Sequence, residues 1–230
     1  MSPTLPDMAS QIYLVEDHPV MRAGYASLIS HESDMEVCGE AGSAEEAFPA
    51  IVELRPDAVV VDLSLPGVNG IELVKRLGAL GDSPSVLVVS AHDEALYAER
   101  VLAAGARGYL MKHESAGNVV EAIRRVLGGH LYLSEKLRER LILSRIAQSP
   151  PPGSPVDPLT DREIEVFEHF GRGRTTQEIA ERLGLSPKTV ESHRANIKKK
   201  MGIEHAPEFV QRAVLWVEQS LSNAETPAAL

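Results

Sequence analysis

Short apolar runs alternate with helical patterns over the first 130 residues, and this alternation constrains the fold of the chain more than any other feature. Five runs rich in Val, Ile and Leu are predicted as strands, at residues 11–15, 35–39, 58–62, 85–90 and 108–111. Helical periodicity fills the intervals, at residues 20–30, 44–54, 71–80, 95–104 and 115–127. Apolar strands separated by helices indicate a doubly wound, five-stranded parallel sheet that is covered on both faces. Pro49 falls inside the second helix, where we expect a late start or a kink.

A proline-rich stretch ends this pattern. Residues 144–158 read SRIAQSPPPGSPVDP; the prolines cannot lie inside a helix, and Gly and Ser favour a solvated connector. A helix at residues 134–146 is predicted to lead into this linker. Beyond it only helices are predicted, at residues 161–170, 176–183, 187–201 and 207–221. The chain is therefore expected to contain an α/β domain followed by a small all-α domain.

The sequence carries no sign of export or of membrane insertion. No apolar run approaches the roughly 20 residues that span a bilayer. The first residues, MSPTLPDMASQ, lack the basic segment and apolar core of a secretory signal. Cys38 is the single cysteine, which excludes an internal disulfide and a multi-cysteine metal site. We expect a cytoplasmic protein with no membrane partner.

The charge is distributed unevenly along the chain. The net charge of −10 argues by itself against a nucleic-acid partner, but residues before Asp157 carry −8 and the remainder only −2. Within the remainder, Lys188–Lys200 holds five basic residues and one acid, Glu191. Because charges are screened over about 8–10 Å, such a local basic surface is enough to contact DNA phosphates.

Polar residues follow the predicted strands at the points where the strands end. Glu16 and Asp17 follow the first, Asp62 ends the third, Ser90 ends the fourth and Lys112 follows the fifth. Ligands bind at the carboxyl ends of the strands in an open parallel sheet, so these five side chains are expected to converge. Converging carboxylates repel one another, and a hard divalent cation such as Mg²⁺ relieves that repulsion.

A carboxylate in such a site can act as a nucleophile on phosphorus and form an aspartyl phosphate. The charge of the transferred group then requires a metal, a cation such as Lys112 and a hydroxyl donor such as Ser90. Taken singly, each acid is more often a cap or a surface charge, and the lysine is more often half of an ion pair. The ordered set, which includes D-x-x-x-P-x-x-x-G from Asp62, is much harder to obtain by accident.

This set resembles the receiver domain of two-component response regulators. The matching segments are EDH, DLSLPGVNGIEL, VVSAHDE and GARGYLMKHES, within residues 11–130. The resemblance implies a flavodoxin-like fold with Asp62 as phosphoacceptor. Asp17 and Asp62 would then bind Mg²⁺ directly, with Glu16 acting through water and Ser64 through its carbonyl. Ser90 and Lys112 would bind the phosphoryl group, and Tyr109 occupies the position of the switch aromatic, although a buried tyrosine often only packs.

The second domain contains a segment with helix-turn-helix spacing, TTQEIAERLGLSPKTVESHRANIKKKMGI. Gly184 permits a tight turn between two helices, and on the second helix Val190, Ile197 and Met201 mark a buried stripe. The opposite face can lie in the major groove; it carries Lys188, Glu191, Ser192, Ala195 and Lys199. A solvated helical hairpin is the alternative, because consecutive lysines usually indicate only a wet surface.

Residues 157–222 resemble the DNA-binding domain of LuxR-type regulators, through LTDREIEVF and EIAERLGLSPKTVESHRANIKKKMGI. With a receiver at 11–130 and a helix and linker at 131–156, this arrangement is similar to that of the NarL/FixJ subfamily. The match places Glu191, Ser192 and Ala195 toward bases. It makes Lys188, Thr189, Arg194 and Lys199 candidates for phosphate contacts.

The resemblance implies a regulator that is phosphorylated on Asp62 by a sensor histidine kinase and then binds promoter DNA as a dimer, with RNA polymerase as a further partner, and that is not an enzyme. The last helix has a broad apolar arc, from Phe209 to Leu221, part of which we expect to form the homodimer contact. Two alternatives remain. One is a receiver that dimerises without phosphorylation. The other is a haloacid-dehalogenase-like phosphatase, which usually has a second Asp where Ser64 stands.

Overall fold

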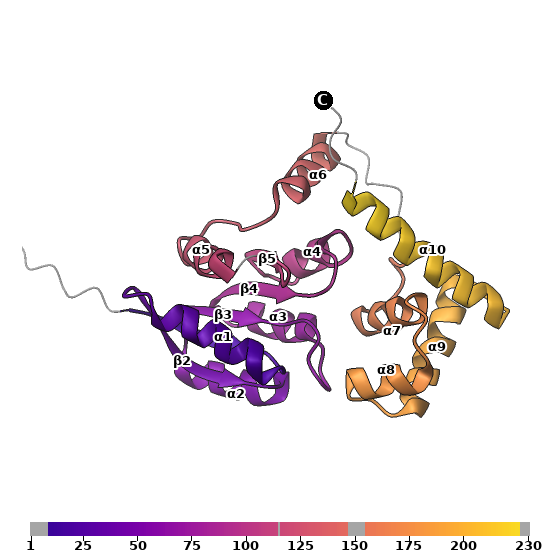
Figure 1. Ribbon diagram of the computed structural model, residues 1–230, viewed down its shortest axis with the longest axis horizontal. Helices are drawn as coiled ribbons and strands as arrows, with labels where there is room; N and C mark the ends of the chain where they lie inside the picture. Colours follow the sequence, from indigo (N-terminus) through magenta and orange to yellow (C-terminus); the bar gives the residue numbers. More distant parts are fainter. Residues whose placement is uncertain (1–8, 115, 147–154, 226–230) are drawn as a thin grey trace, which may run out of the picture. The chain divides into compact units, whose positions relative to one another are not determined.

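The computed structural model describes residues 9–114, 116–146 and 155–225, and it divides the chain into two compact units, Met1–Ser134 and Glu135–Leu230. The first unit is an α/β domain and the second is entirely helical in its described residues (Figure 1). Most of the predicted linker, residues 147–154, lies outside the described residues.

Five parallel strands form the sheet of the first unit, in the order β2-β1-β3-β4-β5. The predicted doubly wound fold is confirmed, and the point at which the strand order reverses lies between β1 and β3. The strands are β1 (Ser10–Val15), β2 (Met35–Ala41), β3 (Ala58–Val61), β4 (Ser85–Ser90) and β5 (Gly108–Met111). The helices between and after them are α1 (Pro19–Ser30), α2 (Ala44–Leu54), α3 (Gly70–Gly78), α4 (Glu94–Ala103) and α5 (Ala116–Leu127).

The strands are buried on both faces because helices cover both faces. Alternate residues of the central strands, such as Leu14, Val60 and Val89, pack in one core with α1 and α5. The residues between them face the opposite way, toward the side on which α2, α3 and α4 contact one another in series. All four residues of β3 are buried, so only its ends are accessible to ligands.

Helix α2 differs from expectation at its start. It begins at Ala44 and runs past Pro49 to Leu54, so the late start is wrong. Ser43 caps the helix by accepting a hydrogen bond from the Glu46 main-chain N–H. This cap satisfies a free donor of the first turn. The helix therefore forms ahead of the proline, which removes a single main-chain hydrogen bond further along.

The second unit contains α6 (Glu135–Ile146), α7 (Asp161–Gly171), α8 (Thr176–Leu183), α9 (Pro187–Met201) and α10 (Ala206–Glu225). Capping boxes begin α7 at Thr160 and α8 at Thr175. Gly184 ends α8 with φ 62°, a left-handed conformation that glycine adopts without strain. The tight turn that joins the two helices of the predicted helix-turn-helix is therefore present.

An aromatic cluster fills the core of this unit. Phe167 of α7 lies 5.4 Å from Phe209 and 5.6 Å from Trp216 of α10, between ring centroids. Phe170 packs edge-on against Phe209 at 5.3 Å. Trp216 is thus a core residue. On α9, Val190 and Ile197 are fully buried while Met201 is only half-buried, so the predicted stripe is deepest in the first three turns.

Candidate functional site

The strand ends of β1, β3 and β5 bring three charged side chains into direct contact. The Lys112 Nζ lies 2.7 Å from the Glu16 Oε2 and 2.9 Å from the Asp62 Oδ2. Both acids are 2% exposed, and they are brought together although they lie 46 positions apart in the sequence. Parallel pairing places them together, because the Asp62 main-chain N–H donates to the Val15 carbonyl at the end of the neighbouring strand. The predicted convergence of these residues is present in the structure.

Gly70, the first residue of α3, allows the chain after β3 to fold back tightly on itself. A Cβ at Gly70 would lie 2.2 Å from the Asp62 carbonyl oxygen and 2.7 Å from the Leu63 Cα. The Gly70 N–H donates to the Leu63 carbonyl, and the Asn69 side chain caps α3 by accepting from the Ile71 N–H. The β3–α3 loop, residues 62–69, is consequently held close to Asp62 at both ends.

Burial and mutual contact change the pKa values of Glu16 and Lys112. Desolvation, followed by the nearby charge of Asp62, raises the pKa of Glu16, and the contacts with Lys112 limit that rise. Burial alone would lower the pKa of Lys112, but its contacts with Asp62 and Glu16 outweigh burial and raise it. Lys112 is therefore a cation that balances part of the carboxylate charge.

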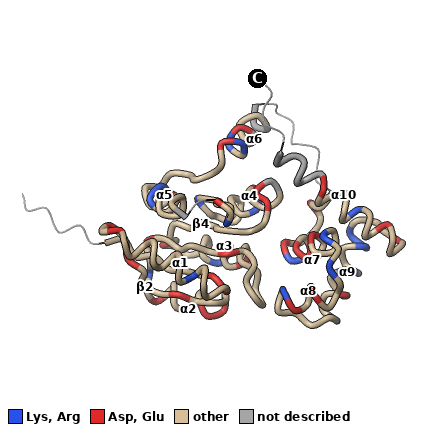
Figure 2. The backbone as a smooth tube through the Cα atoms, viewed as in Figure 1, with Lys and Arg blue, Asp and Glu red and all other residues tan. Residues whose placement is uncertain are grey.

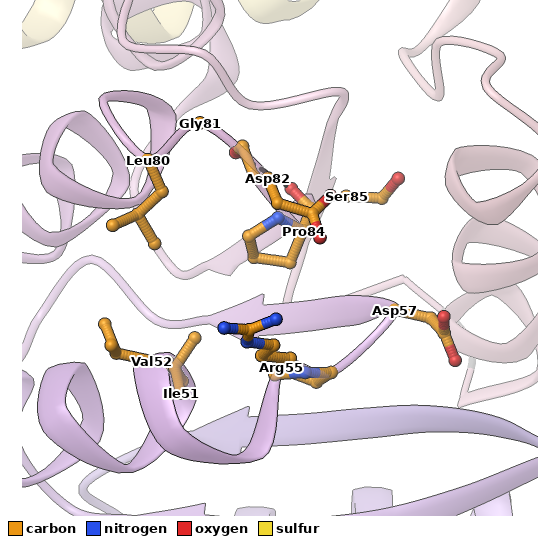
Figure 3. Close-up of a pocket in the computed structure, with 11 residues that line it drawn as sticks. Ile51, Val52, Arg55, Asp57, Leu80, Gly81, Asp82, Pro84 and Ser85 are labelled. Atoms are coloured by element: carbon orange, nitrogen blue, oxygen red, sulfur yellow. Dashed lines mark hydrogen bonds between the residues drawn. The ribbon is translucent and has the colours of Figure 1, made fainter.

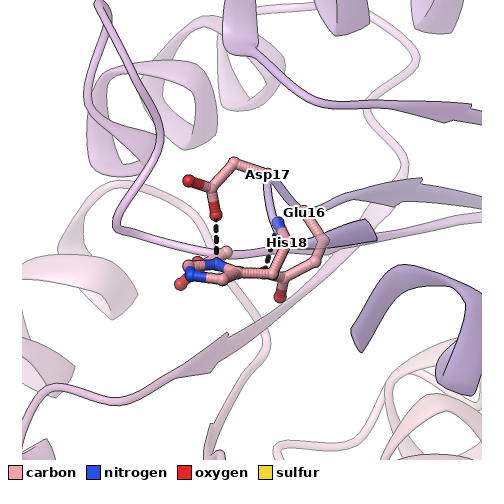
Figure 4. A group of neighbouring side chains, drawn as sticks. Glu16, Asp17 and His18 are labelled. Carbon is pink, nitrogen blue, oxygen red and sulfur yellow. Dashed lines mark hydrogen bonds and ion pairs between the residues drawn. The ribbon is translucent and has the colours of Figure 1, made fainter. Parts of the chain in front are cut away.

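Asp17 and His18 extend this acidic group toward the surface. Each of Glu16, Asp17, His18 and Asp62 offers an oxygen or nitrogen, and these atoms lie within 4.8 Å of one another (Figure 4). The His18 Nδ1 lies 2.7 Å from the Asp17 Oδ1, and the histidine side chain is 66% exposed. The Glu16 Oε2 is buried and accepts no hydrogen bond from any described residue, although Lys112 is at ion-pair distance. A hard cation with oxygen ligands fits such a set.

Ser90, His92 and Tyr109 form a second cluster, which Ser64 links to Asp62. Ser90 is fully buried, and its Oγ accepts from the His92 main-chain N–H at 3.1 Å. The Tyr109 hydroxyl donates to the His92 carbonyl at 2.8 Å, so this aromatic ring lies inside the domain. The His92 Nε2 and the Ser64 Oγ are hydrogen-bonded at 2.9 Å. The Ser64 main-chain N–H in turn donates to the Asp62 Oδ1 at 3.2 Å.

Sequence reasoning did not single out His92. The signal was present, because His92 stands two residues after the strand-end Ser90, in the loop where ligands of such sheets bind. A lone histidine in a loop is nevertheless most often a surface residue. Its contacts with Ser64 and with the Tyr97 ring of α4, 4.6 Å away, depend on packing that the sequence pattern does not display.

A surface pocket lies at the opposite edge of the same sheet. Arg55, Asp57, Asp82 and Pro84 are among the residues that line it, next to the points where β3 and β4 begin (Figure 3). Asp57 already accepts a hydrogen bond from the Gln11 main-chain N–H. The pocket therefore belongs to the amino ends of the strands, away from Asp62.

Helix α9 carries several basic residues, which are blue in Figure 2. Their environments differ. Lys188 and Lys199 are exposed, as are Glu191, Ser192 and Ala195. By contrast, the Lys200 Nζ lies 2.6 Å from the buried Glu163 of α7, and the Lys198 Nζ donates to the Glu204 carbonyl. The three consecutive lysines therefore have three different surroundings.

Several of the predicted contact residues also have partners within the unit, and one of them is Ser192, whose hydroxyl donates to the Lys188 carbonyl. The Arg194 guanidinium lies 5.2 Å from the Phe170 ring centroid and 5.3 Å from that of Phe209, so it stacks on the aromatic core. The Thr189 Oγ1 is hydrogen-bonded to Ser186, the cap of α9. The Glu191 Oε1 accepts from the Thr176 hydroxyl. On the helix face predicted to meet DNA, Thr189 and Arg194 are half-buried, whereas the other predicted contact residues are exposed: Lys188, Glu191, Ser192, Ala195 and Lys199.

Comparison with known proteins identifies both units. Residues 12–124 match the response regulator receiver domain, and residues 157–213 match the bacterial regulatory proteins of the luxR family. The transcriptional regulatory protein UhpA of Salmonella typhimurium is 36% identical over 201 residues, which cover 87% of this chain and 96% of UhpA. The chain belongs to the LuxR-type response regulators. The predicted family, fold class and role in transcription are thereby confirmed.

Further relatives of this response regulator agree. The oxygen regulatory protein NreC of Staphylococcus epidermidis is 32% identical over 210 residues, covering 89% of the chain and 96% of NreC. A LuxR-family two-component response regulator from Aurantimonas matches with TM-score 0.56 and 33% identity, over 60% of this chain and 99% of that one. In the described part of the chain, no helix is both long and apolar enough to cross a membrane.

Proposed function

We propose that this response regulator accepts a phosphoryl group on Asp62 from a sensor histidine kinase and then binds promoter DNA as a homodimer. The observation that carries the proposal is the position of Lys112, whose Nζ lies between two buried carboxylates at the ends of β1 and β3. An Asp62 oxygen attacks phosphorus while the bond between phosphorus and the kinase histidine breaks, and the histidine nitrogen regains a proton. The resulting group is an acyl phosphate.

Mg²⁺ is the cation proposed for the acidic group, and when bound it offsets negative charge on the phosphoryl oxygens. Asp17 and Asp62 would hold it directly, Glu16 through water, and Ser64 through its carbonyl. Lys112 balances charge on the Asp62 side. The Ser90 hydroxyl turns from the His92 N–H to the phosphoryl group, and Tyr109, hydrogen-bonded to the same loop residue, responds to that movement.

Phosphoacceptor replacement tests the assignment. Asp62→Asn should abolish incorporation of phosphate from radiolabelled acetyl phosphate, and it should abolish any increase in DNA affinity that this donor produces. Asp57→Asn is a matched control, because Asp57 precedes the same strand but lies at the opposite edge of the sheet. Unchanged labelling of Asp62→Asn would contradict the proposal. Labelling that persists without Mg²⁺ would contradict the proposed metal.

DNA contact is proposed for α9, with Lys188, Thr189, Arg194 and Lys199 toward phosphates and Glu191, Ser192 and Ala195 toward bases. The exposure of Lys188 and Lys199 supports this placement. Bidentate and charged side chains on such a helix distinguish bases in the major groove. RNA polymerase is proposed as the further partner of the DNA-bound form.

The dimer contact is proposed on α10. Val210 is 41% exposed and Leu215 is 46% exposed, whereas Phe209, Ala213, Trp216 and Val217 of the same helix are buried. The side chain of Leu221 lies outside the described residues. Sedimentation of the phosphorylated protein on DNA with two half-sites should give a dimer that Val210→Lys weakens. A complex that remains monomeric would reject this contact.

A further inference from the structure

A pair of side chains joins two loops beside Asp62. The β3–α3 loop contributes Ser64, and the loop after β4 contributes His92, whose Nε2 is hydrogen-bonded to the Ser64 Oγ at 2.9 Å. His92 is 7% exposed, so this bond lies largely out of competition with water. The two loops connect different strands and helices, and this bond joins them next to the phosphorylation site.

His92 is itself held firmly. Its ring packs against the ring of Tyr97, which is fully buried in α4, with 4.6 Å between centroids. Its main-chain N–H donates to the Ser90 Oγ, and its carbonyl accepts from the Tyr109 hydroxyl. A residue whose ring and main chain are both held in this way can fix the position of a neighbouring side chain through a hydrogen bond.

Ser64 is the residue that His92 holds through this hydrogen bond. Its main-chain N–H donates to the Asp62 Oδ1 at 3.2 Å, so the Ser64 peptide lies against the reacting carboxylate. The close approach of Gly70 to the Asp62 carbonyl fixes the far end of the loop. Between these ends Ser64 is oriented by its hydroxyl, and the His92 ring is the partner of that hydroxyl.

We infer that His92 is a positioning residue of the phosphorylation site, acting through the Ser64 hydroxyl to fix the main chain of Ser64 beside Asp62 and the cation. This inference rests on the proposed function. It gives His92 a role toward the metal that is distinct from its packing on Tyr97. Groups that orient a metal ligand through a hydrogen bond typically change metal affinity about 10- to 100-fold when removed.

Four variants of the full-length protein separate the hydrogen bond from the packing. His92→Phe keeps an aromatic ring against Tyr97 but loses Nε2, and Ser64→Ala keeps the main chain but loses the hydroxyl. His92→Gln loses the ring but keeps a hydrogen-bonding group that can reach Ser64. His130→Phe is the matched control, because His130 is exposed and lies beyond the end of α5, at the other edge of the sheet.

Mg²⁺ affinity of the unphosphorylated protein, measured by calorimetry, is the main readout. His92→Phe and Ser64→Ala should each bind Mg²⁺ about tenfold more weakly, and the double variant should be no weaker than either single one. His92→Gln should recover most of the affinity, and His130→Phe should match the parent protein. The rate of labelling by acetyl phosphate at limiting Mg²⁺ should follow the same order.

The outcomes distinguish the inference from the proposed function. If the parent protein binds no Mg²⁺ and takes no label, the proposed function fails. If the parent binds and His92→Phe binds equally well, the inference fails while the proposed function stands. Additive losses in the double variant, or a loss in His92→Gln as large as that in His92→Phe, would also overturn it, because either result would show that the effect does not act through the hydrogen bond between His92 and Ser64. Hydrogen exchange of β4 checks that each variant is folded.

Discussion

Lys112→Met removes an ammonium group that lies between two buried acids. The Nζ is 2.7 Å from Glu16 and 2.9 Å from Asp62, and all three side chains are largely buried. At an effective dielectric constant of 20, the Coulomb attraction in each contact is about 6 kcal/mol. The cost of removing these charged groups from water cancels much of that attraction. Removing one partner of a buried pair typically costs about 3–5 kcal/mol. We expect the free energy of unfolding of the receiver domain to fall by that amount at pH 7 without Mg²⁺.

The loss should also depend on pH. Burial and the charge of Asp62 already raise the pKa of Glu16, and Lys112 opposes that rise, so the variant should raise the pKa further. A folded state with a raised carboxyl pKa binds a proton more tightly than the unfolded chain does. The destabilisation should therefore be complete above the folded pKa of Glu16 and should diminish as the pH falls toward the unfolded value.

Hydrogen exchange of the β1 and β3 amides in the full-length protein measures this effect. Trp216 is the single tryptophan of the chain, so its fluorescence reports on the second unit and should not change. Arg124→Met is the matched control, because Arg124 also contacts two acids, Glu32 and Asp34, but on the surface. A surface pair contributes about 1 kcal/mol or less. If Lys112→Met loses no more than Arg124→Met, or loses equally at pH 5 and pH 8, the electrostatic reasoning is refuted.

Further predictions concern both units. Lys188→Ala and Lys199→Ala should each reduce the salt dependence of DNA binding by about one counterion. Lys200→Ala should change it less, because the Lys200 ammonium already contacts Glu163. Equal slopes for the three variants in fluorescence anisotropy titrations would contradict this. Burial would raise the pKa of Glu163, but hydrogen bonds from Lys200 and from the α7 cap outweigh burial and lower it. The stabilisation of the second unit by Glu163 should therefore be complete above the carboxyl pKa of the unfolded chain. It should be lost as the pH falls through the folded pKa, which tryptophan fluorescence can follow. Glu163→Gln should remove that pH dependence. Gly70→Ala should slow labelling by acetyl phosphate, because a Cβ there would displace the main chain of the phosphoacceptor; an unchanged rate would show that the loop tolerates the shift.

The arrangement of the sheet could be predicted from the sequence because buried parallel strands leave a clear pattern. Runs such as VVVD at residues 59–62 are apolar on both faces and end in a polar residue. The end of a strand fixes where its next side chain lies, so Asp62 and Lys112 could be expected together. The late start of α2 expected from Pro49 is wrong, because the local cap at Ser43 decides where the helix begins.

Side-chain partners across the fold could not be predicted in the same way. Lys198, Lys199 and Lys200 are equivalent in the sequence, yet the neighbours that distinguish them come from the Glu204 turn and from α7. Arg194 lies on the helix expected to bind DNA, but its stacking depends on where Phe170 and Phe209 pack. Such contacts follow from tertiary packing, which periodicity and spacing do not encode.

The carboxylate that carries the phosphoryl group can be identified directly. Full-length protein treated with acetyl phosphate and Mg²⁺ is reduced with borohydride, which converts a phosphorylated aspartate to homoserine, and peptides are then mapped by mass spectrometry. The account predicts the modification at position 62, within the peptide that follows β3. Modification of Asp17 or another acid with Asp62 intact, or no modification under conditions that phosphorylate a known receiver, would contradict it.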